Sequence, residues 1–238
     1  MSTRGAFVVF EGGDGTGKST QQRMLAGTLA EHGVDHLSTF EPGDSWLGRE
    51  VRRLVLSPGS GDITPRAEAL LYIADKAQHV AEVVEPALNR GSVVVCDRYV
   101  DSTLAYQGAG RVLAVDEVET LARWATLDLR PDLTVLLDLE PESGLATIGE
   151  RDRIEAAGVD LHERVRAGFL ALARRDPQRY LVVPARSGTP EAIAGVVLRR
   201  VLELDHPWPA SLRAAAGRPD AGGRRPAGMS GPGDRLVP

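Results

Sequence analysis

A glycine-rich segment near the start of the chain ends in Gly-Lys-Ser, a combination typical of a phosphate-binding loop. The spacing from Gly12 to Ser19 is the Walker A pattern, in which backbone N–H groups surround phosphate oxygens, the lysine reaches the outer phosphates and the hydroxyl binds Mg²⁺. A glycine-rich surface turn is the alternative, but such turns do not usually carry Gly-Lys-Ser between a strand and a helix. We therefore expect nucleotide phosphates to bind the loop Gly12, Gly13, Asp14, Gly15, Thr16, Gly17, Lys18, Ser19 and Thr20.

A second group of charged residues follows the apolar run Ser92–Cys96. Asp97 comes directly after that run, where a Walker B acid would help to hold Mg²⁺, either directly or through water. Arg98 would then face the same crevice. A salt bridge at the end of a strand is the alternative explanation for this pair, and the neighbouring phosphate loop favours function. Ser19 and Asp97 are therefore the predicted Mg²⁺ ligands.

These groups need a scaffold in which strands alternate with helices. Short apolar runs bounded by turn residues predict strands, and apolar residues at helical spacing predict helices between them. The alternation indicates an α/β protein with a doubly wound parallel sheet, whose ligands bind at the carboxyl ends of the strands. The expected strands are 7–10, 36–40, 92–96, 133–139 and 180–183, and the expected helices are 21–30, 47–56, 64–84, about 102–107, 116–126, 161–175 and 190–204.

The composition indicates one globular α/β domain that meets a small nucleotide. The chain has 238 residues, of which 42% are hydrophobic and 26% charged, and its formal net charge of −5 gives no sign of a nucleic-acid surface. Cys96 alone cannot form an internal disulfide, and no apolar run reaches the length of a membrane span. Because no basic segment precedes an apolar one at the start, we expect a cytoplasmic protein without a membrane partner.

Three segments resemble bacterial thymidylate kinases, a family of P-loop nucleoside monophosphate kinases. They are the loop from Phe10 to Thr20, the turn Glu41-Pro42-Gly43 and the stretch from Asp97 to Gly108, DRYVDSTLAYQG, which is specific where the loop is widely shared. The resemblance runs from about Gly5 to about Leu204. It implies a three-layer fold with about five strands, transfer of the γ-phosphoryl group of ATP to dTMP with Mg²⁺, and a homodimer.

The resemblance assigns the phosphate side of the site. Lys18, Ser19 and Thr20 would belong to ATP and Mg²⁺, and Arg98 would hold the phosphate of the acceptor. Asp14 resembles the acid that reaches the 3′-hydroxyl of the deoxyribose and the metal region. Lys18, Arg98 and Asp14 are thereby candidates for catalysis, since phosphoryl transfer asks the protein for positioning and charge neutralisation.

The resemblance also assigns residues that contact the base and the sugar of the acceptor. Tyr72 stands where the family has an aromatic, usually Phe, that stacks on the base, and a tyrosine in a helix core is the alternative. Thr103 and Gln107 match positions that hydrogen-bond the thymine edge. Tyr106 matches a tyrosine that crowds the 2′ position of the sugar and would favour deoxyribose.

The chain departs from the family pattern around the acceptor. Phe40 and Asp44 flank Glu-Pro-Gly where many bacterial members have Arg and Gly, and Lys76 replaces an Arg that commonly helps to grip the acceptor phosphate. Glu41 and Arg52 remain substrate-binding candidates in this region, with an exposed helix-face arginine as the alternative for Arg52. These departures predict reduced acceptor affinity and leave open a kinase for another or modified deoxynucleotide.

A lid at about residues 144–157 is the last part that the resemblance implies. Such a lid keeps water out and supplies an arginine to the transferred phosphate, which can be worth about 10³–10⁵ in rate. Because loop positions 13–16 hold no Arg, Arg151 and Arg153 are the predicted catalytic arginines, with solvated pairing to neighbouring acids as the alternative. The lid is short, and a degraded lid would fit a nucleotide-binding regulatory protein derived from the kinase.

The end of the chain has a different composition. From Pro207 on, 12 of the last 32 residues are Pro or Gly, and five Arg stand against two Asp. Such a segment buries too little apolar surface to fold alone. We therefore expect a P-loop kinase domain at 1–205 and a disordered tail at 206–238. The histidines show no metal-ligand spacing, so Mg²⁺ is the only metal implied.

Overall fold

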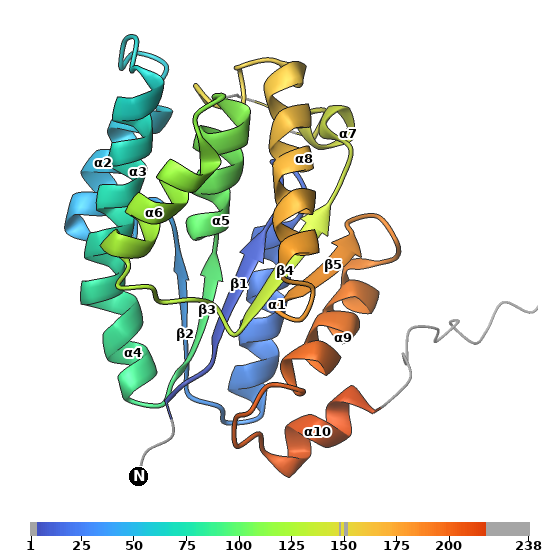
Figure 1. Ribbon diagram of the computed structural model, residues 1–238. Coiled ribbons are helices and arrows are strands. Elements are labelled where there is room, and N and C mark those ends of the chain that lie inside the picture. The colour runs from blue at the N-terminus through green and yellow to red at the C-terminus, as the bar shows by residue number, and fades with distance from the viewer. Residues whose placement is uncertain (1–3, 148, 150–151, 218–238) are drawn as a thin grey trace, which may run out of the picture.

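The computed structural model describes residues 4–147, 149 and 152–217. Five parallel strands form one sheet in the order β2-β3-β1-β4-β5 (Figure 1). Each strand agrees with its predicted range to within one residue at either end, so the doubly wound parallel sheet is confirmed. The strands are β1 (Phe7–Glu11), β2 (His36–Phe40), β3 (Val93–Asp97), β4 (Leu133–Asp138) and β5 (Tyr180–Pro184).

Successive residues of the central strand β1 point to opposite faces of the sheet. Val8 and Phe10 belong to the apolar core on one face, whereas Phe7 and Val9 belong to the core on the other. All four side chains are at most 1% exposed, as a strand covered by helices on both faces requires. The layer on the side of Val8 and Phe10 consists of α1 (Lys18–Glu31) and α9 (Pro190–Val201).

The opposite face carries the longer layer of helices (Figure 1). The helix predicted at 64–84 continues to Asn89, because a π-helical turn leads into a last short helix. Pro86 lies in the first turn of that short helix, where its missing N–H group has no hydrogen bond to make. The layer consists of α3 (Pro65–His79), η1 (Val80–Val84), α4 (Glu85–Asn89), α5 (Val100–Thr103), η2 (Leu104–Gly110), α6 (Val115–Ala125) and α8 (Val159–Arg175).

Two shorter helices border the carboxyl ends of the strands. The helix α2 (Trp46–Leu56) is capped by Ser45, whose hydroxyl accepts from the backbone N–H of Gly48 at 2.9 Å. Its apolar side packs against Tyr72 of α3, which fixes the distance between the two helices. The helix α7 (Pro141–Leu145) was not expected from the sequence and opens the predicted lid.

The prediction of a disordered tail from residue 206 is wrong for its first part. Residues 206–217 pack on the domain, and Ala210–Ala216 form the helix α10. Trp208 is 6% exposed and Leu212 is fully buried, both within the core on the α1 and α9 face. Two large apolar side chains are enough to hold this segment despite its polar and proline-rich surroundings. The remaining tail residues, 218–238, lie outside the described part of the chain.

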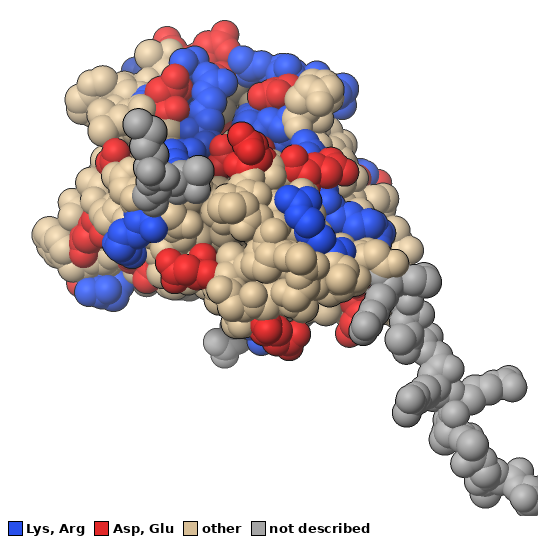
Figure 2. All heavy atoms as spheres, turned by 90° about the horizontal axis from the view of Figure 1, so that it is seen from below, with Lys and Arg blue, Asp and Glu red and all other residues tan. Residues whose placement is uncertain are grey.

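The surface on the side of α10 carries both signs of charge. Figure 2 views the molecule from below and shows acidic and basic side chains interspersed among uncharged ones. This face therefore has no field of a single sign that would attract a polyanion. Among the residues that the structure describes, no helix has the length and hydropathy that a membrane span needs.

The packing of α10 predicts a loss of stability when Leu212 is truncated. We expect Leu212→Ala to lower the free energy of unfolding by about 2–5 kcal/mol, because it removes a fully buried side chain. The measurement is urea unfolding followed by circular dichroism. Arg213→Ala, at an exposed position of the same helix, is the matched control and should change stability by less than about 0.5 kcal/mol. Equal stability of the two variants would show that α10 does not contribute to the core.

Candidate active site

The glycine-rich loop connects β1 with α1 and is held close to the lid. Gly12 has a φ of 136°, and a side chain there would overlap the carbonyl oxygen of Leu137. Gly15 has a φ of 73°, and a Cβ there would overlap the carbonyl oxygen of Gly144. The loop therefore opens at the N-terminus of α1, an arrangement that binds phosphate through backbone N–H groups and the helix dipole.

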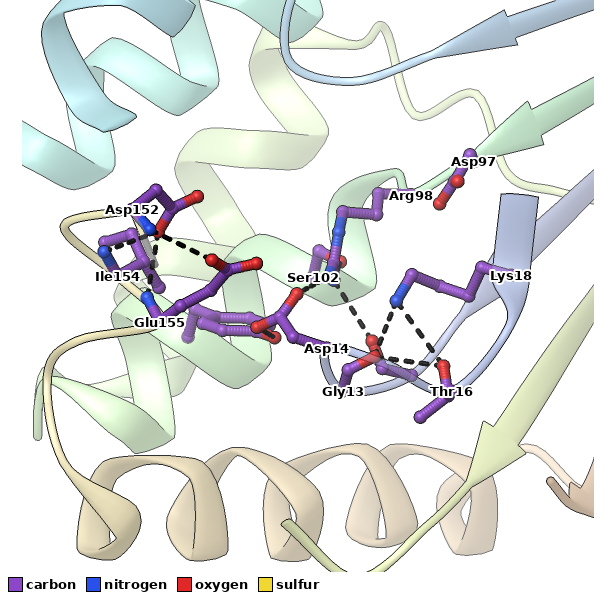
Figure 3. Close-up of polar contacts among 12 residues, drawn as sticks. Gly13, Asp14, Thr16, Lys18, Asp97, Arg98, Ser102, Asp152, Ile154 and Glu155 are labelled. Atoms are coloured by element: carbon purple, nitrogen blue, oxygen red, sulfur yellow. Dashed lines mark hydrogen bonds and ion pairs between the residues drawn. The ribbon is translucent and has the colours of Figure 1, made fainter. Parts of the chain in front are cut away.

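Lys18 lies folded back over this loop (Figure 3). Its Nζ donates to the carbonyl oxygen of Gly13 at 2.6 Å, and the side chain is buried. Burial and the positive charge of Arg98 lower the pKa of Lys18 to about 8, although the carboxylates of Asp14 and Asp97 oppose the shift. A phosphate group entering the loop would supply negative charge that stabilises the protonated lysine.

Arg98 reaches the same place from the end of β3. Its φ is 70°, a left-handed conformation that few non-glycine residues adopt and that is common at functional sites. The guanidinium donates to the carbonyl oxygen of Gly12 at 3.1 Å and forms an ion pair with Asp14, which also accepts from the hydroxyl of Tyr106 at 2.7 Å. Although burial opposes ionisation, Arg98 and Lys18 lower the pKa of Asp14. Asp14, Arg98 and Tyr106 thus form one connected group.

The turn that carries Arg98 is fixed by a residue that sequence reasoning did not place in the site. Glu11 is fully buried and accepts from the backbone N–H groups of Tyr99 and Ser102 at 2.8 and 3.0 Å, and from the hydroxyl of Ser102 at 2.6 Å. Burial and the charge of Asp101 raise the pKa of Glu11 to about 7. A carboxylate within an otherwise apolar strand, directly before the loop, was the signal available in the sequence.

The two predicted Mg²⁺ ligands are in contact. The hydroxyl of Ser19 donates to Oδ2 of Asp97 at 2.6 Å, and both side chains line the pocket. The described residues contain no group of three or more His, Cys, Asp or Glu that could hold a metal. One hydroxyl and one carboxylate suit Mg²⁺, which commonly takes its remaining ligands from water and substrate phosphates.

A cavity of about 570 Å³ extends from the loop between α3 and η2. Thr103 faces it with a buried hydroxyl oxygen that has no hydrogen-bond partner in the described part of the chain. A buried polar atom of this kind is satisfied when a ligand occupies the cavity. The structure brings the predicted residues together around it, the lining including Asp14, Lys18, Glu41, Arg52, Tyr72, Lys76, Arg98, Thr103, Tyr106 and Gln107.

Glu41 and Lys76 line this cavity but are already paired with each other. Lys76 Nζ lies 2.8 Å from Glu41 Oε2, and both side chains are at most 2% exposed. His79 Nδ1 lies 2.7 Å from the other oxygen of Glu41. Although burial opposes ionisation of the carboxyl, Lys76 and His79 lower the pKa of Glu41. The substrate-binding roles of Glu41 and Lys76 stay predictions, because much of the charge of Lys76 is offset within the protein.

The other departures from the family pattern also have local partners. Phe40 lies under the guanidinium of Arg52, 5.7 Å from its ring centroid, and Arg52 donates to the carbonyl oxygen of Pro42 at 2.8 Å. Asp44 accepts from the hydroxyl of Thr39 at 2.6 Å. Arg52 is an exposed residue of α2, as in the alternative, but these contacts hold its side chain beside the cavity that it lines, and its substrate-binding role stays a prediction.

The structure places Arg153 away from the phosphate loop. Its Nε donates to the carbonyl oxygen of Val55 at 2.9 Å, and its guanidinium pairs with Glu68 of α3. The lid acids Asp152 and Glu155 accept from backbone N–H groups of the lid, and among the described residues the ion pair of Arg153 is with Glu68 and not with them. The buried carboxylate of Glu68 attracts Arg153, so its catalytic role stays a prediction. Arg151 lies outside the described residues.

The lid itself reaches the acceptor side of the site. Figure 3 shows Asp152, Ile154 and Glu155 on the far side of Asp14 from Lys18, and all three lid residues line the cavity. The backbone of Gly144, where the predicted lid begins, lies against the loop at Asp14 and Gly15, and the bounds of the lid stay a prediction. Residues 148 and 150–151, in the middle of the lid, lie outside the described residues.

Comparison with known proteins identifies the relatives of this chain. The sequence model of the family described as thymidylate kinase matches residues 10–194. The thymidylate kinase of Cutibacterium acnes is 62% identical over 200 residues, which are 84% of this chain and 98% of the relative. That of Clavibacter michiganensis is 51% identical over 199 residues, 82% and 94% of the two chains. The crystal structure of a thymidylate kinase from Ehrlichia chaffeensis superposes with a TM-score of 0.69 at 30% identity, covering 84% of this chain and 100% of that one.

The lowered pKa of Lys18 predicts that binding of ATP at about pH 8.5 takes up protons. At that pH much of the free protein carries a neutral lysine, and the phosphates favour its charged form. Titration calorimetry in two buffers of different ionisation enthalpy measures the uptake. Lys18→Arg is the control, because arginine stays charged and removes the titrating group. Identical binding enthalpies for the wild type in the two buffers would contradict the prediction.

Proposed function

Because the chain belongs to the thymidylate kinase family, it is an ATP-dependent kinase of dTMP, and we propose that the cavity beside the phosphate loop holds both reacting phosphates. The observation that carries this proposal is that Lys18, Arg98 and Asp14 line the same cavity as Thr103 and Gln107. The charged residues suit phosphates, and the polar residues suit the edge of a base. Phosphoryl transfer needs this positioning more than covalent chemistry.

On the donor side, the loop residues 12–20 bind the phosphates of ATP. Lys18 lies within reach of the transferred phosphoryl group once it leaves its contact with the carbonyl oxygen of Gly13. Ser19 and Asp97 would hold Mg²⁺, which neutralises charge on the phosphate oxygens. Their 2.6 Å contact and their place in the lining of the cavity support this assignment.

On the acceptor side, Arg98 binds the phosphate of dTMP and Asp14 meets the 3′-hydroxyl of the sugar. The hydroxyl of Tyr106 fixes Asp14, and its ring occupies the space in which a ribose 2′-hydroxyl would lie. Tyr72, 9% exposed, offers its ring to the base. Thr103 and Gln107 present polar groups to the edge of that base, and the unpartnered hydroxyl of Thr103 supports this role.

The lid completes the site from the opposite side. We assign Arg151 to the transferred phosphate, since loop positions 13–16 contain no arginine. Arg153 fastens the lid to α2 and α3 through Val55 and Glu68, and it reaches the phosphates only if the lid changes conformation. The proposed kinase domain includes α10 and therefore extends beyond residue 205.

We also assign a homodimer, and support for it comes from an apolar patch on and after α6. Leu121, Trp124 and Leu127 are 45%, 79% and 79% exposed, and these three residues are named the α6 patch. Large apolar side chains clustered on a surface mark an interaction site more often than scattered ones do. A second copy of the chain is the occupant we assign to the α6 patch. The cytoplasmic location stays a prediction.

The kinase activity is tested with a panel of acceptors. Purified protein with ATP and Mg²⁺ should form dTDP from dTMP faster than it phosphorylates any other nucleoside monophosphate. Lys18→Ala, Arg98→Ala and Arg151→Ala should each lower kcat at least about tenfold, or about 1.4 kcal/mol of barrier. Arg53→Ala, whose side chain is exposed, is the control and should retain wild-type kcat. Wild-type rates in the first three variants would refute the assigned site, and absence of dTMP-dependent ADP formation would refute the activity.

The homodimer is tested by placing a charge in the α6 patch. Trp124→Glu should shift the protein from dimer to monomer in analytical ultracentrifugation, since a buried unpaired carboxylate opposes association. Val196→Glu on α9 makes the same change at a site on the opposite helical layer and should leave the dimer intact. A monomeric wild-type protein, or an intact Trp124→Glu dimer, would count against the α6 patch as the interface.

A further inference from the structure

Glu68 is a buried carboxylate beside the cavity for which the reaction described above has no role. It lies in the first turn of α3, and its side chain is 1% exposed. Three residues donate to it: Gln107 through Nε2 at 3.1 Å, Arg111 through Nε and Nη2 at 3.1 and 3.2 Å, and Arg153 through its guanidinium. Both oxygens of Glu68 are therefore occupied, one of them by the amide of a predicted base-contacting residue.

The contact with Glu68 determines which way the amide of Gln107 faces. An ionised carboxylate accepts hydrogen bonds and donates none, so it must meet the NH₂ group of the glutamine. Burial alone would favour the protonated acid, but the hydrogen bonds from Arg111, Gln107 and Arg153 lower the pKa of Glu68. The carbonyl oxygen of Gln107 is then left for the cavity, which the residue lines, and no described residue donates to that oxygen.

We propose that Glu68 is a positioning residue for base selection, which holds Gln107 with its carbonyl oxygen toward the base and thereby selects a pyrimidine with a proton on N3. The inference rests on the proposed function, in which Gln107 meets the edge of the base. Thymine and uracil carry a donor N–H at N3, whereas cytosine carries an acceptor nitrogen there. A fixed carbonyl oxygen accepts from the first two and repels the third.

Glu68 is held in place from both sides, which is what a positioning role requires. Arg111 binds it side-on through Nε and Nη2, and Arg153 reaches it from the lid. Glu68, Tyr72 and Lys76 follow each other at intervals of four residues, so that one face of α3 carries the amide anchor, the aromatic ring and the paired lysine. The amide therefore cannot rotate without turning its carbonyl oxygen toward a buried carboxylate that has no hydrogen to donate.

The experiment is the substitution Glu68→Gln, which replaces an obligatory acceptor by an amide that can donate or accept. Gln107 can then turn either way without losing its hydrogen bond. We expect the ratio of kcat/KM for dTMP to that for dCMP to fall at least about tenfold. The ratio for dTMP to dUMP should stay within about twofold, because both bases carry the N3 proton. When dCMP turnover is too slow to measure, its Ki as a competitor of dTMP replaces it.

Glu82→Gln is the matched control, since it makes the identical change at an exposed position where the carboxylate accepts from Gln78. It should preserve the dTMP to dCMP ratio. An unchanged ratio in Glu68→Gln, or an equal loss in Glu82→Gln, would overturn the proposal. Wild-type turnover of dTMP tests the proposed function separately, so a wild type that is active with an unaltered Glu68→Gln ratio refutes only the role of Glu68.

If Glu68→Gln fails to unfold cooperatively, the wild-type protein provides the test. The side-chain amide protons of Gln107, assigned in ¹⁵N-labelled protein by their loss in Gln107→Leu, report its orientation. We expect the resonance of one of these protons to lie downfield of the side-chain amide resonances of exposed Gln178. Its chemical shift should stay the same when dTMP or dCMP is added. Exchange of the two proton positions on addition of dCMP would show that the amide turns freely, and would overturn the proposal.

Discussion

The site depends on the buried carboxylate of Glu11. Removing this group from water is unfavourable, and the backbone N–H groups of Tyr99 and Ser102 compensate by donating to it. The end of β1 is thereby tied to the turn after β3. That turn holds Arg98 in its left-handed conformation and directs it over the loop. Strand register alone would bring the two segments close, but the hydrogen bonds to Glu11 give Arg98 one position.

The parts of the protein governed by local rules were predictable from the sequence. Apolar runs gave the strands to within one residue, and the loop and the stretch after β3 contain residues whose spacing carries their chemistry. The role of Glu68 depends on Gln107, Arg111 and Arg153, which lie far from it in the chain, so no spacing pattern reveals it. In the sequence, only the position of Glu68 four residues before Tyr72 pointed to a role near the base. The packing of Trp208 and Leu212 could not be predicted either, because composition does not show that two apolar side chains of a polar segment reach the core.

The acceptor side of the cavity carries less net positive charge than its sequence suggests. Lys76 is paired with Glu41, and His79 shares that carboxylate, so this cluster adds little net positive charge. Arg52 lies over Phe40 and donates to a backbone carbonyl, contacts that leave its positive charge in place. Positive charge that lines the cavity is therefore carried by Lys18, Arg52 and Arg98, of which Arg98 is also paired with Asp14.

The contact between Gly15 and Gly144 links the loop and the lid more closely than their separation in the chain implies. A Cβ on Gly15 would overlap the carbonyl oxygen of Gly144, and a Cβ on Gly144 would overlap that of Asp14. Each backbone occupies the space that a side chain on the other would need. The two segments therefore cannot be redesigned or exchanged between relatives one at a time, and a graft of a longer lid has to begin after Gly144 if the nucleotide loop is to keep its shape.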